Sequence, residues 1–185
     1  MDAVQAAFRA VPRAGFLPRG ARSRAAFDGP IPIGHQQTNS QPRTVEAMLR
    51  LLEVRPGDRV LDVGAGSGWT TALLAELTGP DGSVLGTELV PALAAWGAAN
   101  LARTDYHWAS IRLARKGVLG EPASAPYDRI LVSAEARTLP EQLVAQLGDS
   151  GRLVIPVRGT MTLVVRRGEE LQTSTHGAYR FVPLL

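Results

Sequence analysis

The sequence contains no cysteine, few aromatic residues and no long apolar run. Without cysteine it has no disulfide, thiolate metal ligand or cysteine nucleophile, and so it carries no sign of an oxidising compartment. No apolar stretch approaches the roughly 20 residues that a membrane-spanning helix needs, and residues 1–10 lack the pattern of a signal peptide. We therefore expect a cytoplasmic protein with no membrane partner.

The chain also has little excess charge of either sign. Its formal net charge is only +3, and all but one of its 20 basic residues are arginine. Several arginines lie in the first 24 residues, but no aromatic residues alternate with them as they do in single-strand-binding surfaces. The three histidines lack the short helical spacing of a metal pair. We expect neither a nucleic-acid partner nor a metal.

The 185 residues, 45% of them hydrophobic, are sufficient for one domain with a sizeable core. We expect a single domain over 1–185, since there is no internal repeat or obvious linker. A short helix over 2–10 is followed by a proline-rich, loop-like stretch to residue 42, which we assign to the substrate side of the protein. Residues 43–185 would form the α/β core.

From residue 43 onward, helical and strand patterns alternate. After a helix over 43–53, strands are predicted over 59–63, 83–87, 109–113, 129–133 and 152–157, with helices over 69–78, 91–103 and 140–147. Residues 162–166 and 171–175 form a predicted terminal antiparallel hairpin. This order predicts a doubly wound α/β fold: a mainly parallel, Rossmann-like sheet with helices on both faces and a C-terminal antiparallel hairpin.

The sharpest local signal is a glycine-rich turn after the strand 59–63. Gly64, Gly66 and Gly68 alternate with small residues and precede a helix, a pattern that lets a ligand approach the backbone closely. A dinucleotide fingerprint would place its third glycine where this chain has Trp69, so the turn suits S-adenosyl-L-methionine better than a pyrophosphate. The alternative is a tight turn without a ligand.

Two acidic residues accompany the glycine turn. Glu88 ends the next strand, twenty residues beyond Gly68, where a carboxylate can accept hydrogen bonds from both hydroxyls of a ribose. Asp62 precedes the turn and either binds nearby backbone amides or reaches the amino group of the cofactor. Together with Gly64, Gly66 and Gly68, these residues form the predicted cofactor site.

The segments that flank the glycine turn resemble those of a known family. They are Val11-Pro12-Arg13, Phe16-Leu17-Pro18, the run from Pro30 to Pro42, Tyr127-Asp128-Arg129-Ile130, the run from Gly151 to Val157, and Arg180-Phe181-Val182-Pro183-Leu184. In this order they are similar to blocks of the protein-L-isoaspartate (D-aspartate) O-methyltransferases, and they span almost the whole chain. The resemblance implies a methyltransferase of the class I, S-adenosylmethionine-dependent type.

The resemblance also implies a substrate and residue roles. The family esterifies the carboxylate of isoaspartyl or D-aspartyl residues, and the ester then closes to a succinimide, so that aged proteins are repaired. By resemblance, Ser40 is the active-site hydroxyl with Thr38 beside it, and His35 and Gln37 lie in the segment that binds the substrate. Without the resemblance, Thr38 and Ser40 would be explained as a turn or a helix cap. We expect a monomer that acts on peptides or proteins.

Some positions depart from the family pattern. Gln36 replaces a glycine, Asn39 replaces an apolar residue, and Lys116 replaces an aspartate that receives the adenine amino group, while Glu135 and Arg137 introduce charges near the expected cleft. Lysine offers donors and no acceptor. Two alternatives therefore stay open: a methyltransferase that esterifies aspartate in one dedicated partner, and a non-catalytic binding module with a degraded cofactor site.

Overall fold

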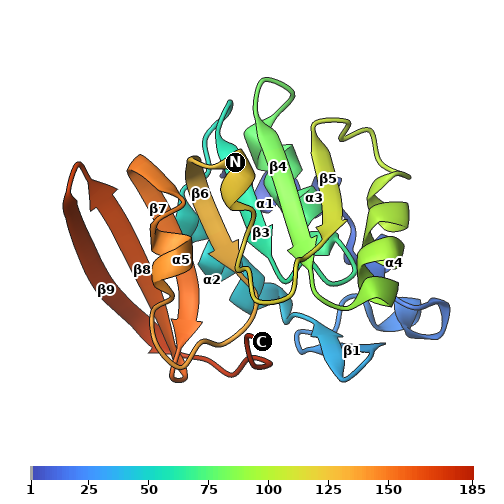
Figure 1. Cartoon of the computed structure of the whole chain (residues 1–185). Helices are drawn as coiled ribbons and strands as arrows, with labels where there is room; N and C mark the ends of the chain where they lie inside the picture. Colours follow the sequence, from blue (N-terminus) through green and yellow to red (C-terminus); the bar gives the residue numbers. More distant parts are fainter. Residues whose placement is uncertain (1) are drawn as a thin grey trace.

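A computed structural model describes residues 2–185 and is built on one seven-stranded sheet (Figure 1). The strand order is β5-β4-β3-β6-β7-β8-β9, parallel from β5 to β7 and antiparallel from β7 to β9. The strands are β3 (Arg59–Val63), β4 (Ser83–Glu88), β5 (Ala109–Leu113), β6 (Tyr127–Val132), β7 (Leu147–Val157), β8 (Thr160–Arg167) and β9 (Glu170–Ala178). A separate two-stranded hairpin pairs β1 (Ile31–Gly34) with β2 (Gln37–Asn39).

The helices cover the two faces of the sheet unequally. They are α1 (Ala3–Ala10), α2 (Pro42–Leu52), α3 (Trp69–Thr78), α4 (Pro91–Leu101) and α5 (Glu141–Val144), with 3-10 turns η1 (Arg13–Phe16), η2 (Arg19–Arg24) and η3 (Pro122–Ser124). Figure 1 shows α1, α2 and α3 behind the sheet and α5 in front of it. The sheet is therefore covered on both faces, as expected, but loops supply most of the second layer.

Two apolar clusters follow from this arrangement. Because neighbouring side chains of a strand point to opposite faces, Val60 packs with the long helices and Leu61 packs with α5. The first cluster contains the buried apolar side chains of α1, α2 and α3, together with Leu101 of α4. The second contains Leu143 and Val144 of α5 and residues of β6 and β7. The central strands β3, β4 and β6 are buried on both faces along most of their length, which explains their largely apolar sequences, whereas β5 and β9 are mostly exposed.

The mainly parallel sheet and the terminal antiparallel hairpin are as the sequence predicts. The expected strands 59–63 and 109–113 and the expected helix 69–78 match β3, β5 and α3. The prediction of a loop-like N-terminal stretch was wrong, because the stretch forms η1, η2 and the β1–β2 hairpin. The hairpin alternates buried and exposed residues at only a few positions, which is too short a pattern for a strand prediction.

The boundary between α5 and β7 was also predicted wrongly. The expected helix over 140–147 ends at Val144, and β7 already begins at Leu147. Leu147 pairs with Tyr127 and Arg152 pairs with Arg129, so residues 148–151 bulge out of the ladder between these two pairs. The glycines of that bulge indicated a turn rather than a strand, although the strand continues on both sides of it.

The strand order places a ligand crevice at one end of the sheet. After β3 the chain crosses to β4 and β5, and it then returns to pair β6 against the other edge of β3. Such a reversal opens a crevice beyond the carboxyl ends of the central strands. The β1–β2 hairpin and the C-terminal segment lie at this end (Figure 1). No helix within residues 2–185 is both long and apolar enough to cross a membrane.

Candidate active site

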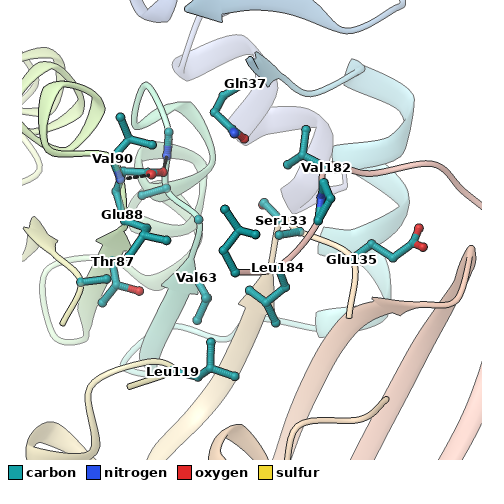
Figure 2. A pocket seen from close by; sticks show the side chains of 18 of the residues that line it. Gln37, Val63, Thr87, Glu88, Val90, Leu119, Ser133, Glu135, Val182 and Leu184 are labelled. Atoms are coloured by element: carbon teal, nitrogen blue, oxygen red, sulfur yellow. Dashed lines mark hydrogen bonds between the residues drawn. The ribbon is translucent and has the colours of Figure 1, made fainter. Parts of the chain in front are cut away.

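A cavity of about 580 Å³ occupies the crevice beyond the ends of β3, β4 and β6. We call the lining residues within 63–70 and 87–90 the glycine wall. The lining residues within 114–120, 133–140 and 182–185 form the opposite side, which we call the distal wall. Residues 31–40, which we call the hairpin segment, also contribute to the lining through Ile33 and residues 37–40. Figure 2 shows Glu88 and Val90 on one side, and Ser133, Glu135 and Val182 on the other. The volume lies within the range of roughly 300–1,000 Å³ found for small-molecule sites.

The glycine wall has a backbone conformation that needs glycine. Gly64, Gly66 and Gly68 have φ angles of 83°, 53° and 89°, in the left-handed region that other residues avoid. Gly64 and Gly66 line the cavity, whereas Gly68 lies behind the wall, where an added Cβ would stand 2.9 Å from the carbonyl oxygen of Gly97. The third glycine therefore allows α3 and α4 to pack closely.

Glu88 is buried at the rim of this wall, with 7% of its surface exposed. One carboxylate oxygen accepts from the backbone N–H of Gly66 and the other from that of Val90, each at 2.8 Å, and Figure 2 shows both bonds. These bonds fix the carboxylate between two loops. Because a carboxylate offers about four acceptor positions, Glu88 can still accept hydrogen bonds from two ligand hydroxyls.

Asp62 lies one layer deeper and does not line the cavity. Its side chain is fully buried and accepts a hydrogen bond from Thr71 Oγ1 at 2.7 Å, while its second oxygen has no partner within residues 2–185. Burial raises the pKa of Asp62 to about 7, with a smaller contribution from the charge of Glu88. Its expected contact with the cofactor stays a prediction.

The hairpin segment brings two of the predicted hydroxyl groups to the cavity. Thr38 and Ser40 line it, and neither hydroxyl forms a hydrogen bond within the described part of the chain. Helix α2 begins at Pro42 with Gln41 as its N-cap, so Ser40 is not the cap of that helix. The cap explanation is therefore wrong for Ser40.

The two residues predicted to bind the substrate are placed differently. Gln37 lines the cavity and His35 does not. His35 and Gln36 form the exposed turn of the hairpin, with φ angles of 52° and 60°. A glycine would adopt this conformation with less strain than Gln36 does.

The distal wall departs most from the family pattern. Lys116 is exposed and does not line the cavity, whereas Arg115 and Gly117 on either side of it do. Arg115 pairs with Glu121 at 2.8 Å, and the carbonyl of Arg115 accepts from the backbone of Val118. The lysine side chain therefore lies outside the cavity.

The rest of the distal wall comes from segments far apart in the sequence. Glu135 donates its backbone N–H to Val182 and accepts from Leu184 through its carbonyl, at 2.7 and 2.8 Å. The carboxylate of Glu135 points away from the cavity in Figure 2. The sequence indicates Val182 and Leu184 only as part of the closing motif, because no local pattern shows that the end of the chain returns to β6.

The described residues have the features that S-adenosylmethionine requires. The glycine turn leaves the backbone open to a ligand, and Glu88 offers free acceptor positions for ribose hydroxyls. The apolar side chains of Val63, Val90 and Leu119 face the same space, where an adenosyl group can be shielded from water. The neutral hydroxyls of Thr38 and Ser40, from the hairpin segment, stand at the other end of the cavity.

Fold and site together define a class I S-adenosylmethionine-dependent methyltransferase. The family model for protein-L-isoaspartate(D-aspartate) O-methyltransferase matches residues 1–185. The chain is 46% identical to a protein-L-isoaspartate O-methyltransferase of Methanopyrus kandleri over 95% of its length and 80% of the relative's. It is 43% identical to the Methanocella arvoryzae enzyme over 95% and 94% of the two chains. This chain belongs to the protein-L-isoaspartate(D-aspartate) O-methyltransferase family.

A solved structure supports the same assignment. It is a crystal structure of a putative protein-L-isoaspartate O-methyltransferase from Plasmodium falciparum in complex with S-adenosyl-L-homocysteine. The two chains superimpose with a TM-score of 0.88 at 26% identity, over 100% of this chain and 91% of that one. The family's cofactor, S-adenosylmethionine, is therefore the cofactor of this protein.

Proposed function

We propose that this protein transfers the methyl group of S-adenosylmethionine to the free α-carboxylate of L-isoaspartyl residues and to the side-chain carboxylate of D-aspartyl residues in peptides and proteins. The observation that carries the proposal is the full-length family match on a chain whose cavity joins a glycine turn, an acidic acceptor and two unpaired hydroxyls. The methoxy group of the product ester leaves more readily than an oxygen of the free carboxylate, and this permits ring closure to the succinimide on which repair depends.

The reaction demands little acid–base chemistry of the protein. An aspartyl carboxylate ordinarily has a pKa near 4, so it is ionised at neutral pH and needs no general base. The bound cofactor supplies an electrophilic methyl group. The protein must hold the carboxylate in line with it and exclude water. A cavity lined by few ionisable groups suits that task.

Ser40 and Thr38 are the groups that we assign to the substrate carboxylate. Each hydroxyl can donate one hydrogen bond to a carboxylate oxygen and leave the other oxygen free to attack. Both line the cavity, and neither hydroxyl has a hydrogen-bond partner in the described part of the chain, so no such bond has to break. Gln37 stands beside them as a further donor for the peptide.

Glu88, Gly64 and Gly66 are the residues that we assign to the cofactor. Glu88 would accept from the ribose hydroxyls, and the two glycines would leave room for the ligand against the backbone. We further propose that the protein acts as a monomer. Light scattering at working concentration tests that point.

The decisive experiment measures methyl transfer from labelled S-adenosylmethionine to an isoaspartyl peptide and to its normal aspartyl twin. We expect labelling of the isoaspartyl peptide only. Ser40→Ala should lower kcat/KM by about 10- to 100-fold, as expected for losing a hydrogen bond to a charged group. Ser174→Ala, on the exposed strand β9, is the matched control and should change nothing.

Three other outcomes would alter the proposal. Labelling of both peptides would remove the isoaspartyl specificity. Cofactor binding without labelling of either peptide would favour a dedicated partner as substrate. Failure to bind S-adenosylhomocysteine would contradict the catalytic assignment itself.

A further inference from the structure

Arg13 of η1 is a buried cation that forms no ion pair with a carboxylate within residues 2–185. Only 5% of its surface is exposed. Its Nε donates to Asn39 Oδ1 at 2.6 Å and its Nη1 to the carbonyl of Phe27 at 2.8 Å. Its Nη2 donates to the carbonyls of Gly29, Asn39 and Ser40 at 2.8–3.0 Å. Arg13 therefore joins the N-terminal segment to the two residues that end the hairpin segment.

Arg13 also contacts the glycine wall. The guanidinium lies 5.4 Å from the centre of the Trp69 ring, and the indole N–H of Trp69 donates to the carbonyl of Val11. Burial lowers the pKa of Arg13 to about 10, so it stays charged at neutral pH. A charge buried among carbonyls and an aromatic face is costly to move. Arg13 is therefore a rigid anchor.

The anchor fixes the orientation of the Asn39 amide. Arginine can only donate hydrogen bonds, so the amide oxygen of Asn39 must face it and the amide NH₂ must point the other way. That NH₂ donates to Ser67 Oγ at 3.1 Å, between two side chains that are 5% and 2% exposed. Ser67 lies between Gly66 and Gly68, and its carbonyl accepts from Asn100 of α4.

The Asn39–Ser67 bond thus connects the two functional parts of the site. Asn39 stands between Thr38 and Ser40, and Ser67 stands inside the glycine turn. Ile33 of β1 also lies close to Gly66, since a Cβ added at Gly66 would stand 3.3 Å from Ile33 Cδ1. A displacement of Ser67 would therefore lengthen or break its hydrogen bond with Asn39.

We propose that Asn39, oriented by Arg13, is a positioning residue that couples cofactor binding at the glycine turn to the order of Thr38 and Ser40. Cofactor and peptide then bind cooperatively, by a factor on the order of 5 or more, as coupled sites typically do. The catalytic consequence rests on the proposed function, but the coupling itself is a property of ligand binding.

The first test is hydrogen exchange of residues 33–41 with and without S-adenosylhomocysteine. In the unaltered protein the ligand should slow exchange in this segment about tenfold, and Ser67→Ala should remove that protection. Asn39→Asp is the conservative variant: its second oxygen can accept from the Ser67 hydroxyl, so protection should return. Asn39→Leu should behave like Ser67→Ala, and the double variant should lose no more than either single one.

The second test separates coupling from a general structural role. The affinity for S-adenosylhomocysteine is measured by calorimetry with and without saturating isoaspartyl peptide. The ratio of the two affinities should fall toward 1 in Ser67→Ala and be kept in Asn39→Asp. A residue with a merely structural role would lower both affinities and leave their ratio unchanged.

The outcomes distinguish this inference from the proposed function. If the unaltered protein methylates no isoaspartyl peptide but shows ligand-dependent protection that Ser67→Ala removes, the reaction is wrong and the coupling stands. If Ser67→Ala or Asn39→Leu keeps the protection, or if the unaltered protein shows none, the coupling is wrong whatever the enzyme methylates. Should Ser67→Ala fail to fold, Asn39→Leu and Asn39→Asp make the same comparison.

Discussion

The two walls of the cavity are built in different ways. The glycine wall comes from two neighbouring strand ends, and its shape is set by left-handed glycines and by Glu88, which binds the backbone of both loops. The distal wall comes from three segments, one of which, residues 182–185, is far from the other two in the sequence and is held by backbone hydrogen bonds to Glu135. One wall is fixed locally, whereas the other depends on the completed fold.

The difference suggests how the two walls share the function. Backbone conformation that only glycine adopts cannot vary without loss of the ligand site, so the cofactor side is constrained residue by residue. The distal wall presents exposed side chains such as Arg137, whose replacement costs little in folding. We therefore expect changes in the glycine wall to affect binding and stability strongly, and changes in the distal wall to affect substrate preference.

Removing the carboxylate of the glycine wall should have the largest effect. Glu88→Ala deletes the acceptor for two ribose hydroxyls, and hydrogen bonds to a charged group contribute about 1.5–3 kcal/mol each. The affinity for S-adenosylhomocysteine, measured by calorimetry, should fall by about 100-fold or more. Glu88→Gln keeps one acceptor oxygen and should lose less.

The matched control for Glu88 is the carboxylate of the distal wall. Glu135 holds the closing segment through its backbone, while its side chain points away from the cavity. Glu135→Ala should change the affinity less than about threefold, within the small effect of a partly exposed charge. If Glu88→Ala and Glu135→Ala lowered the affinity equally, the expected difference between the two walls would be wrong.

Adding a methyl group to the glycine turn should produce the next largest effect. In Gly68→Ala, a φ angle of 89° is unfavourable by about 1–2 kcal/mol, and the new Cβ would stand 2.9 Å from Gly97 O and 3.0 Å from Ile111. Relief of that contact costs about 1–3 kcal/mol more. The free energy of unfolding of Gly68→Ala, measured by chemical denaturation, should therefore be lower by the sum of these two costs.

Gly117 of the distal wall is the control for this substitution. Its φ angle is 78°, but an added Cβ would meet nothing within 4 Å. Gly117→Ala should therefore cost only the conformational part, about 1–2 kcal/mol. If the two variants unfold at the same denaturant concentration, the close packing of α3 and α4 contributes nothing.

The same contrast explains what the sequence can predict. The glycines, Glu88 and the strands β3 and β4 lie within thirty residues of each other and have a strict spacing, so their proximity follows from a single strand–helix–strand unit. The bonds of Glu135 with Val182 and Leu184, and of Arg13 with Asn39, join residues at least 26 positions apart. No local period reports such contacts, and only the family resemblance pointed to those segments.

The short elements were unpredictable for a related reason. The strands of the hairpin β1–β2 contain only seven residues in all. The hairpin is stabilised by Arg13 and by its proximity to the glycine turn rather than by its own sequence pattern. The early start of β7 likewise depends on Tyr127 of the neighbouring strand. In both cases tertiary contacts override the local signal.

The buried Asp62 behind the glycine wall should make stability depend on pH. Burial raises its pKa to about 7 in the folded protein, whereas the unfolded chain releases this proton near pH 3.8. Between these values the folded state binds more protons, so the free energy of unfolding falls as the pH rises, by about 2–4 kcal/mol in total. Urea unfolding at pH 4.5 and pH 8 measures this loss.

Asp62→Asn isolates the contribution of this group. The amide stays neutral and can still accept from Thr71, so the variant should lose most of the decline in stability between the two pH values. Asp81→Asn, at an exposed position in the α3–β4 turn, should keep the full decline. If the stability of Asp62→Asn declines with pH as that of the unaltered protein does, the Asp62 carboxyl ionises in the folded state well below pH 7.

The smallest effect is expected at the rim of the distal wall. Arg137 lines the cavity, is exposed and forms no ion pair within residues 2–185, so it is available to a carboxylate of the bound peptide. An exposed ion pair contributes about 0.2–1 kcal/mol. Arg137→Ala should raise KM about two- to fivefold for an isoaspartyl peptide flanked by glutamate, and leave KM unchanged for the same peptide flanked by glutamine. High salt should remove the difference between the two peptides in the unaltered protein. If KM rises equally for both peptides, Arg137 shapes the wall and does not read charge.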